Sequence, residues 1–195
     1  FGTSGSLYAS ALVMYDRATE SLWTHFDGRA VAGVPTGEQL EPISSPLLSW
    51  ADFKASYPDG TVLSTESGHR RDYGRNPYTG YDDPDSRPFP FLGTPDDRAR
   101  AKERVVGINV GEDSVAFLLS AVAGGEARAT NSTVGEAPVV ILWKAGQATA
   151  LEGAGVADGR DVGSVGVFSP IVDGRQLTYE ASDDGYTDVE TGTIW

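Results

Sequence analysis

Glycine and proline interrupt this chain every few residues, and this limits the folds that it can form. The sequence has 24 glycines and 11 prolines, and most of the apolar runs between them are short. Short apolar runs separated by turn residues are typical of β-strands, whereas a long helix needs an uninterrupted periodic stretch. We therefore predict a mainly β fold, close to α+β, with a few short helices.

Seven segments have the length and composition of strands. They are residues 12–16, 61–64, 105–110, 139–143, 148–151, 166–168 and 176–180. The turn sequence from Val110 to Asp113 also predicts a hairpin between residues 104–110 and 114–118.

The clearest helix signal lies at residues 49–57. Ser49 is suited to the N-cap, and Pro58 ends the segment. Trp50, Phe53 and Tyr57 follow a helical spacing, so they form one apolar face. Weaker patterns predict short helices over residues 119–123 and 96–103.

Residues 68–95 have no regular period and are rich in proline, glycine, arginine and aromatic side chains. We interpret this stretch as a long ordered loop, and such loops often carry function. Arginine binds carboxylates and phosphates in a bidentate manner, and tyrosine offers a ring and a hydroxyl. The candidate residues for a small anionic ligand are Arg71, Tyr73, Arg75, Asn76, Tyr78 and Tyr81. Alternatively, the loop arginines pair with the acidic residues Asp72, Asp82, Asp83 and Asp85.

A metal ion is the one cofactor that the residues suggest. The chain has only two histidines, His25 and His69, and a two-histidine site needs carboxylates as further ligands. The candidate ligands are His69, Asp82, Asp83 and Asp85. The acidic run lacks the glycine and glutamate of a calcium-binding loop, so a solvated acidic turn is the alternative.

The charge of the chain excludes some partners. Its formal net charge is −13, and only Lys54, Lys102 and Lys144 are lysines. Such a surface repels nucleic acid and anionic lipid. Two interpretations of the charge are open: adaptation to high salt, where repulsion is screened within about 3 Å at 1 M, or an ordinary acidic secreted protein. No apolar run approaches the roughly 20 residues of a membrane-spanning helix.

Few motifs with a defined chemistry are present. The absence of cysteine rules out disulfides, thiolate metal sites and cysteine nucleophiles within this chain. Ser4 lies between glycines, but the spacing is not that of a nucleophile elbow. The tripeptide that starts at Asn131 fits an N-glycosylation acceptor. These observations favour a protein without catalytic activity.

Two segments of the chain, residues 15–23 and 187–195, resemble each other. Asp16, Thr19 and Trp23 have identical counterparts in Asp188, Thr191 and Trp195. Each copy follows a strand-like segment, near Phe1 in one case and near Tyr179 in the other. We interpret the match as a duplicated β unit, in which the two tryptophans have equivalent packing roles.

Several longer runs support a family resemblance. They are FGTSGSLYASALVMYDRATESLW, GEQLEPISS, SWADFKASYPDGTVLS and RRDYGRNPYTGYDD. In order and spacing these runs are similar to the domain of unknown function 3179 family of bacterial and archaeal proteins. The resemblance covers most of residues 1–110 and continues more weakly to the end. It implies a secreted or lipid-anchored protein of unassigned activity.

Typical members of that family extend before the position of Phe1. The additional half carries a histidine-containing segment and a Cys-Pro-Leu-Cys-like motif, which imply metal or redox chemistry. Neither motif stands in this sequence. We therefore expect residues 1–103 to hold the C-terminal part of one β unit with the long loop, and residues 104–195 to hold a second, related unit; one compact domain is the alternative.

Three functional hypotheses follow. The first is an extracytoplasmic binding or structural module, either secreted or at the cell surface, from a salt-adapted organism. The second is a metal-binding or redox protein whose ligands lie mostly in a preceding segment. The third is a subunit of an extracellular assembly that associates with itself through exposed strand edges.

Overall fold

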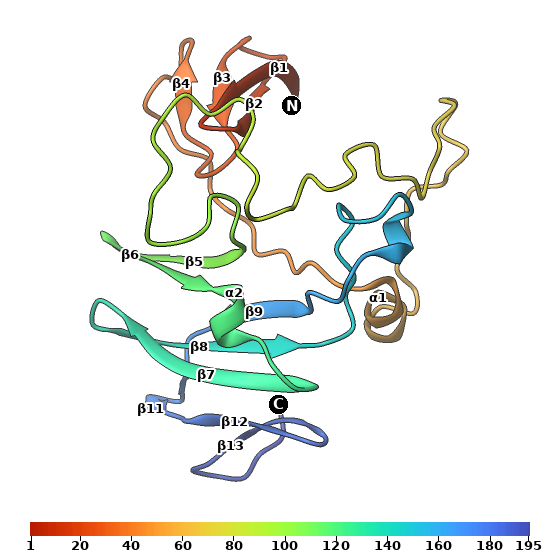
Figure 1. The fold of residues 1–195 in the computed structure, drawn as a ribbon. Coiled ribbons are helices and arrows are strands. Elements are labelled where there is room, and N and C mark those ends of the chain that lie inside the picture. The colour runs from red at the N-terminus through yellow and green to blue at the C-terminus, as the bar shows by residue number, and fades with distance from the viewer. The chain divides into compact units, whose positions relative to one another are not determined.

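Antiparallel strands dominate the structure, a computed structural model that describes residues 1–195 (Figure 1). The predicted mainly β fold class is therefore confirmed. The longest helix has seven residues, so no helix is long and apolar enough to cross a membrane. Contacts divide the chain into two units, which are described separately: residues 1–45 with 85–102, and residues 46–84 with 103–195. The long loop is thus shared between the two units.

The first unit contains one four-stranded antiparallel sheet in which sequential strands are neighbours. Its strands are β1 (Gly2–Tyr8), β2 (Ala11–Tyr15), β3 (Leu22–Thr24) and β4 (Ala30–Ala32). Val13, Trp23 and Ala30 are buried. Strand β2 confirms the strand expected at residues 12–16.

The loop between β2 and β3 is organised around one carboxylate. Asp16 accepts hydrogen bonds from the backbone nitrogens of Ala18 and Thr19, from the Thr19 hydroxyl and from the Trp23 indole. The ring of Phe1 packs edge-on against Trp23, with centroids 6.0 Å apart. We call residues 16–23 the first Asp–Trp loop.

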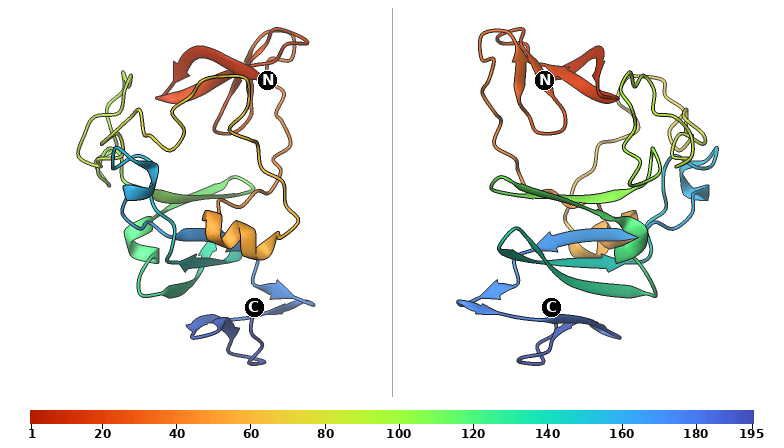
Figure 2. Two further views of the ribbon diagram at one scale, coloured as in Figure 1. Left: turned by 90° about the vertical axis from the view of Figure 1, so that its right-hand side faces the viewer. Right: turned by 60° about the vertical axis from the view of Figure 1, so that its left-hand side comes forward.

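The second unit is built from a β-hairpin and a three-stranded sheet. The hairpin pairs β5 (Val105–Val110) with β6 (Asp113–Leu118) in continuous register, as the sequence predicted. The sheet has the order β7 (Ala127–Val134), β8 (Ala137–Lys144) and β9 (Ser164–Phe168). Figure 2 shows the hairpin and the sheet as two layers. The short helix α2 (Leu119–Val122), also predicted, connects β6 to the segment before β7.

Strand β8 is buried on both faces, because successive side chains of a strand point to opposite sides. On one face, Val139 and Ile141 pack with Val106 and Ile108 of the hairpin and with Val122 of α2. On the other face, Val140 packs against residues of the C-terminal segment. This explains why the sequence of β8 is an almost continuous apolar run.

The C-terminal segment forms two short hairpins, β10 (Ile171–Val172) with β11 (Arg175–Gln176) and β12 (Tyr179–Ser182) with β13 (Gly185–Asp188). Strand β12 is joined to β7 by one side chain. The amide of Asn131 donates to the carbonyl of Tyr179 at 2.8 Å and accepts from its backbone nitrogen at 2.9 Å. The Asn131 side chain thus replaces a backbone ladder step between the two strands.

The loop after β13 repeats the first Asp–Trp loop. Asp188 accepts from the backbone nitrogen and hydroxyl of Thr191, both at 2.6 Å, and from the Trp195 indole at 3.0 Å. Tyr179 packs edge-on against Trp195 with centroids 5.8 Å apart, as Phe1 does against Trp23. We call residues 188–195 the second Asp–Trp loop. The sequence match at residues 15–23 and 187–195 therefore corresponds to two copies of one structural motif.

Three predicted elements are wrong. Residues 61–64 have no regular secondary structure, are exposed and have no strand partner. Residues 148–151 contribute one isolated bridge, Ala148 to Asp161, instead of a strand. Residues 96–103 form turns instead of a helix, and the Asp96 side chain bonds the backbone nitrogen and the guanidinium of Arg98. The other helices are α1 (Trp50–Ser56), which confirms the clearest helix signal, and η1 (Val156–Asp158).

Candidate functional site

Residues 72–82 are held in place by the loop that runs from β8 towards β9. The backbone nitrogens of Asn76 and Gly80 donate to the carbonyls of Ala154 and Leu151, each at 2.9 Å. The backbone nitrogen of Val156 donates in return, to Gly74, at 2.8 Å. Although it contains almost no regular structure, this part of the long loop is therefore ordered, as the sequence predicted.

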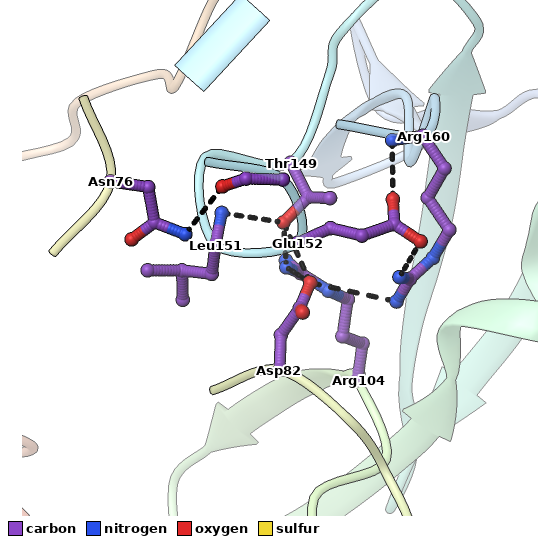
Figure 3. A network of polar contacts seen from close by, with 8 residues as sticks. Asn76, Asp82, Arg104, Thr149, Leu151, Glu152 and Arg160 are labelled. Atoms are coloured by element: carbon purple, nitrogen blue, oxygen red, sulfur yellow. Dashed lines mark hydrogen bonds and ion pairs between the residues drawn. The ribbon is translucent and has the colours of Figure 1, made fainter. Parts of the chain in front are cut away.

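Asn76 is the buried residue of this loop, with 8% of its surface exposed. Its side-chain nitrogen donates to the carbonyl of Gly153 at 2.9 Å, and its side-chain oxygen accepts from the backbone nitrogen of Tyr78 at 2.8 Å. Figure 3 shows Asn76 reaching into the loop that contains Thr149 and Glu152. Asn76 therefore anchors the backbone of this loop.

Asp82 is the centre of a polar network between the two loops (Figure 3). Only 8% of its side chain is exposed, and its Oδ2 accepts from the Thr149 hydroxyl at 2.8 Å and from Arg104 at 3.1 Å. Arg160 lies 3.5 Å away on the same oxygen. Burial by itself raises the pKa of Asp82, but these hydrogen bonds and the Arg160 charge outweigh it and leave the pKa below its usual value.

Glu152 completes the network. One of its carboxylate oxygens lies 3.0 Å from the Arg160 guanidinium, and the other accepts from the Arg160 backbone nitrogen at 2.6 Å. A side chain at Gly159 would place its Cβ 1.9 Å from the Thr149 carbonyl, so only glycine permits this close approach. Two carboxylates and two guanidinium groups thus neutralise one another, and the network positions the loops.

The remaining residues predicted for an anionic ligand lie on the exposed side of this loop. Arg75 and Asp72 form a solvent-exposed ion pair at 3.6 Å. The Tyr73 hydroxyl is 3.0 Å from that of Ser67, and the rings of Tyr78 and Tyr81 meet edge-on, with centroids 6.1 Å apart. Arg71 is exposed as well. The loop thus presents these groups on its surface.

The four residues predicted as metal ligands do not form a metal-binding group. His69 is exposed, Asp82 is engaged by the arginines, and Asp85 lies 3.8 Å from Arg100. The backbone nitrogen of Asp83 donates to Gly80 in a turn. The structure contains no group of three or more histidine, aspartate or glutamate side chains that could hold a metal ion.

A second candidate site lies at helix α1, in the same unit. The helix begins after Ser49, whose hydroxyl oxygen accepts from the backbone nitrogen of Asp52 at 3.1 Å. Asp52 also lies 3.6 Å from Lys144 at the end of β8, which links the helix to the sheet. The hydroxyl of Ser49 and the charge of Lys144 hold the pKa of Asp52 below its usual value, against the opposing effect of burial.

The apolar face of α1 is not covered by the rest of the unit. None of its residues is buried, and the exposed surface is 56% for Trp50 and 51% for the adjoining Tyr57. The rings of Trp50 and Phe53 are stacked at 5.6 Å, and Phe53 and Tyr57 are 5.6 Å apart. The sequence predicted this face but not its exposure. Because an apolar helix face normally packs into a core, an unpaired one indicates a contact surface.

This face forms one wall of a groove of about 560 Å³. We call it the α1 groove; its lining residues are Pro46, Leu47, Leu48, Trp50, Phe53, Tyr57 and Val62. The chain returns over the helix at Gly60, where a Cβ would lie 2.8 Å from the Phe53 ring. Glycine is needed at this position for the second wall to approach the aromatic rings.

The α1 groove was missed at the level of sequence because its two walls carry no motif. A signal was present: the apolar pair Val62 and Leu63 follows a Pro-Asp-Gly turn directly after the amphipathic helix. The composition of residues 61–64 predicted a β-strand, and a strand would pair with others in a sheet. In the structure they lie beside the helix instead, and Val62 and Leu63 are 60% and 90% exposed.

The family model for Protein of unknown function (DUF3179) matches residues 1–195. The chain therefore belongs to this family, as the quoted runs of sequence indicated. No curated protein and no solved structure matches the chain significantly.

Proposed function

We propose that this member of a family of unknown function is a binding module that takes an apolar small molecule in the α1 groove. The observation that carries the proposal is the exposed aromatic face of α1 on a concave surface. Ligand sites are typically clefts of roughly 300–1,000 Å³ with mostly apolar walls and few polar groups, and this groove fits that description.

The energetic argument is the exposed apolar area. Trp50, Tyr57 and Val62 are each more than half exposed. Removing their rings and methyl groups from water would lower the free energy of the protein. Covering apolar surface contributes roughly 25 cal/mol per Å², and an aromatic partner adds a preferred stacking geometry. An apolar ligand that fills the groove would recover this free energy.

Binding is a better description than catalysis for this site. The groove lining contains no carboxylate, histidine or serine, and its polar side-chain groups are the Tyr57 hydroxyl and the Trp50 indole N–H. General acid–base and nucleophilic catalysis require a titratable or nucleophilic group within hydrogen-bond reach of the substrate. The lining residues can hold an apolar ligand by van der Waals and hydrophobic contact, which favours binding.

The exposed side of residues 72–82 is a weaker candidate for the binding site. Asn76 and Asp82 are used to fix the loop, and Arg75 has a carboxylate neighbour in Asp72. Arg104 and Arg160, which contact this loop at Asp82, have their charges balanced by Asp82 and Glu152. We therefore assign to this loop the role of an ordered support within the second unit.

The proposed place of action is outside the cytoplasm, at the cell surface or in a secreted form. The strongly acidic composition and the resemblance to secreted and lipid-anchored proteins support this location. Charge of this magnitude keeps a protein soluble by mutual repulsion, and in high salt that repulsion is screened.

The proposal is tested by titration with phenylnaphthylamine, a neutral dye whose fluorescence rises in apolar surroundings. The wild-type protein should bind it saturably, and Trp50→Ala should weaken binding by roughly tenfold, because an aromatic side chain at a contact surface contributes about 1–3 kcal/mol. The matched control is Tyr78→Ala, which removes another exposed aromatic ring. Equal affinities for Trp50→Ala and wild type would refute the site.

A further inference from the structure

Lys54 places a positive charge beside Trp50, one of the residues that line the α1 groove. Its ammonium nitrogen lies 5.3 Å from the centroid of the Trp50 ring, which lines the groove. A cation above an aromatic face is held there by the ring's quadrupole. The ammonium group is therefore held next to one aromatic wall residue of the groove.

The charge of Lys54 is not compensated by a carboxylate. The structure shows no ion pair for Lys54, whereas Asp52, the only acidic residue of α1, already interacts with Ser49 and lies 3.6 Å from Lys144. Lys54 and Lys144 are two of only three lysines in a chain of net charge −13. An unpaired lysine beside an apolar groove is thus a local departure from the acidic character of the chain.

We propose that the ligand of the α1 groove is an organic anion with an apolar body, and that Lys54 meets its anionic group. This inference rests on the proposed function and specifies the chemical class of the ligand. The apolar body would lie against Trp50, Phe53 and Tyr57, and a carboxylate, sulfonate or sulfate at one end would reach the ammonium group. Such a ligand satisfies both the apolar walls and the free charge.

The net charge of the chain works against this attraction, so the two effects must be compared. Charges separated by more than about 8 Å are largely screened at physiological ionic strength, whereas an anion in contact with an ammonium group is not. The contribution of one exposed ion pair is about 0.2–1 kcal/mol. The contact with Lys54 therefore sets a preference among apolar ligands, while the aromatic walls supply most of the affinity.

Two dyes of similar aromatic structure separate this inference from the proposed function. Phenylnaphthylamine is neutral, and anilinonaphthalene sulfonate is an anion. Lys54→Gln should weaken the binding of the sulfonate by about two- to fivefold and leave the binding of the neutral dye unchanged. Arg17→Gln is the matched control, because it removes one positive charge from another exposed position.

The outcomes are distinct. If Lys54→Gln lowers the sulfonate affinity and Arg17→Gln does not, Lys54 is the anion contact. The inference is overturned if both dyes require Trp50 but Lys54→Gln changes the affinity for neither. It is also overturned if the two charge variants lower the sulfonate affinity equally. In both cases the proposal of an apolar binding groove still stands. If wild-type protein binds neither dye in a Trp50-dependent manner, the proposed function and the inference both fail. Circular dichroism of each variant confirms that the fold is intact.

Discussion

The indole nitrogen of Trp195 donates a hydrogen bond of 3.0 Å to the carboxylate of Asp188, and Trp23 repeats this bond to Asp16 at 2.9 Å. In both copies the carboxylate also accepts from the backbone and hydroxyl of a threonine three residues later. Neither carboxylate has a cation as its partner. Hydrogen bonds to the charged form therefore stabilise each loop, and they lower the pKa of both aspartates.

Asp188→Asn should destabilise the second unit. The amide would offer a nitrogen where the loop needs an acceptor, and donors such as the Trp195 indole would lose their partner. We expect the urea midpoint of unfolding to fall by about 0.5–1 M. Asp183→Asn, in the exposed turn of the same hairpin, is the control. Equal midpoints for the two variants would show that the second Asp–Trp loop does not stabilise the fold.

The same carboxylate predicts a pH dependence. The hydrogen bonds from Thr191, and after them that from Trp195, lower the pKa of Asp188 from 3.8 to about 2, although desolvation opposes them. Because the folded pKa is depressed, the stabilisation is present above pH 3.8 and is lost as the pH falls to about 2. The difference in urea midpoint between wild type and Asp188→Asn should therefore shrink between pH 4 and pH 2. A constant difference across that range would contradict the assigned pKa.

Asp82→Asn should release residues 72–82 locally. The substitution removes the charge that holds Arg104 and Arg160 together at the centre of the network. Amide hydrogen exchange at Asn76 and Gly80, whose nitrogens bond to the neighbouring loop, should accelerate by about tenfold. For comparison, Asp72→Asn breaks only an exposed ion pair and should leave these rates unchanged. Unaltered exchange in Asp82→Asn would mean that the backbone bonds alone fix the loop.

Gly60→Ala should distort the α1 groove. The added Cβ would lie 2.8 Å from the Phe53 ring and 2.9 Å from the carbonyl oxygen of Tyr57, so the ring or the chain must move. Overpacking of this kind costs about 1–3 kcal/mol, and we expect the affinity for phenylnaphthylamine to fall by roughly fivefold. Gly107→Ala meets no atom within 4 Å and serves as the control. An unchanged affinity in Gly60→Ala would place the dye elsewhere.

Local sequence signals predicted the elements that depend on local chemistry. The helix after Ser49, the hairpin on either side of Gly111 and the repeated Asp–Trp loops all rest on contacts within a few residues, which the sequence displays directly. In the first sheet, the sequence indicated β2 and a strand-like segment near Phe1, but β3 and β4 were not predicted, because these three-residue strands carry little local pattern and depend on neighbouring strands.

The candidate site required tertiary information. The proline, glycine, arginine and aromatic content of residues 68–95 predicted an ordered loop. The partners of Asp82, however, are Arg104, Thr149 and Arg160, which no local pattern connects to it. The α1 groove is harder still to foresee. An amphipathic helix predicts an apolar face, and only the fold shows that this face stays exposed.

The most direct test of the account is hydrogen–deuterium exchange of the wild-type protein with and without saturating phenylnaphthylamine. Binding in the α1 groove predicts slower exchange over residues 46–62 and no change over residues 72–82. Protection confined to residues 72–82, or protection in neither segment, would contradict the assignment of the binding site to the helix.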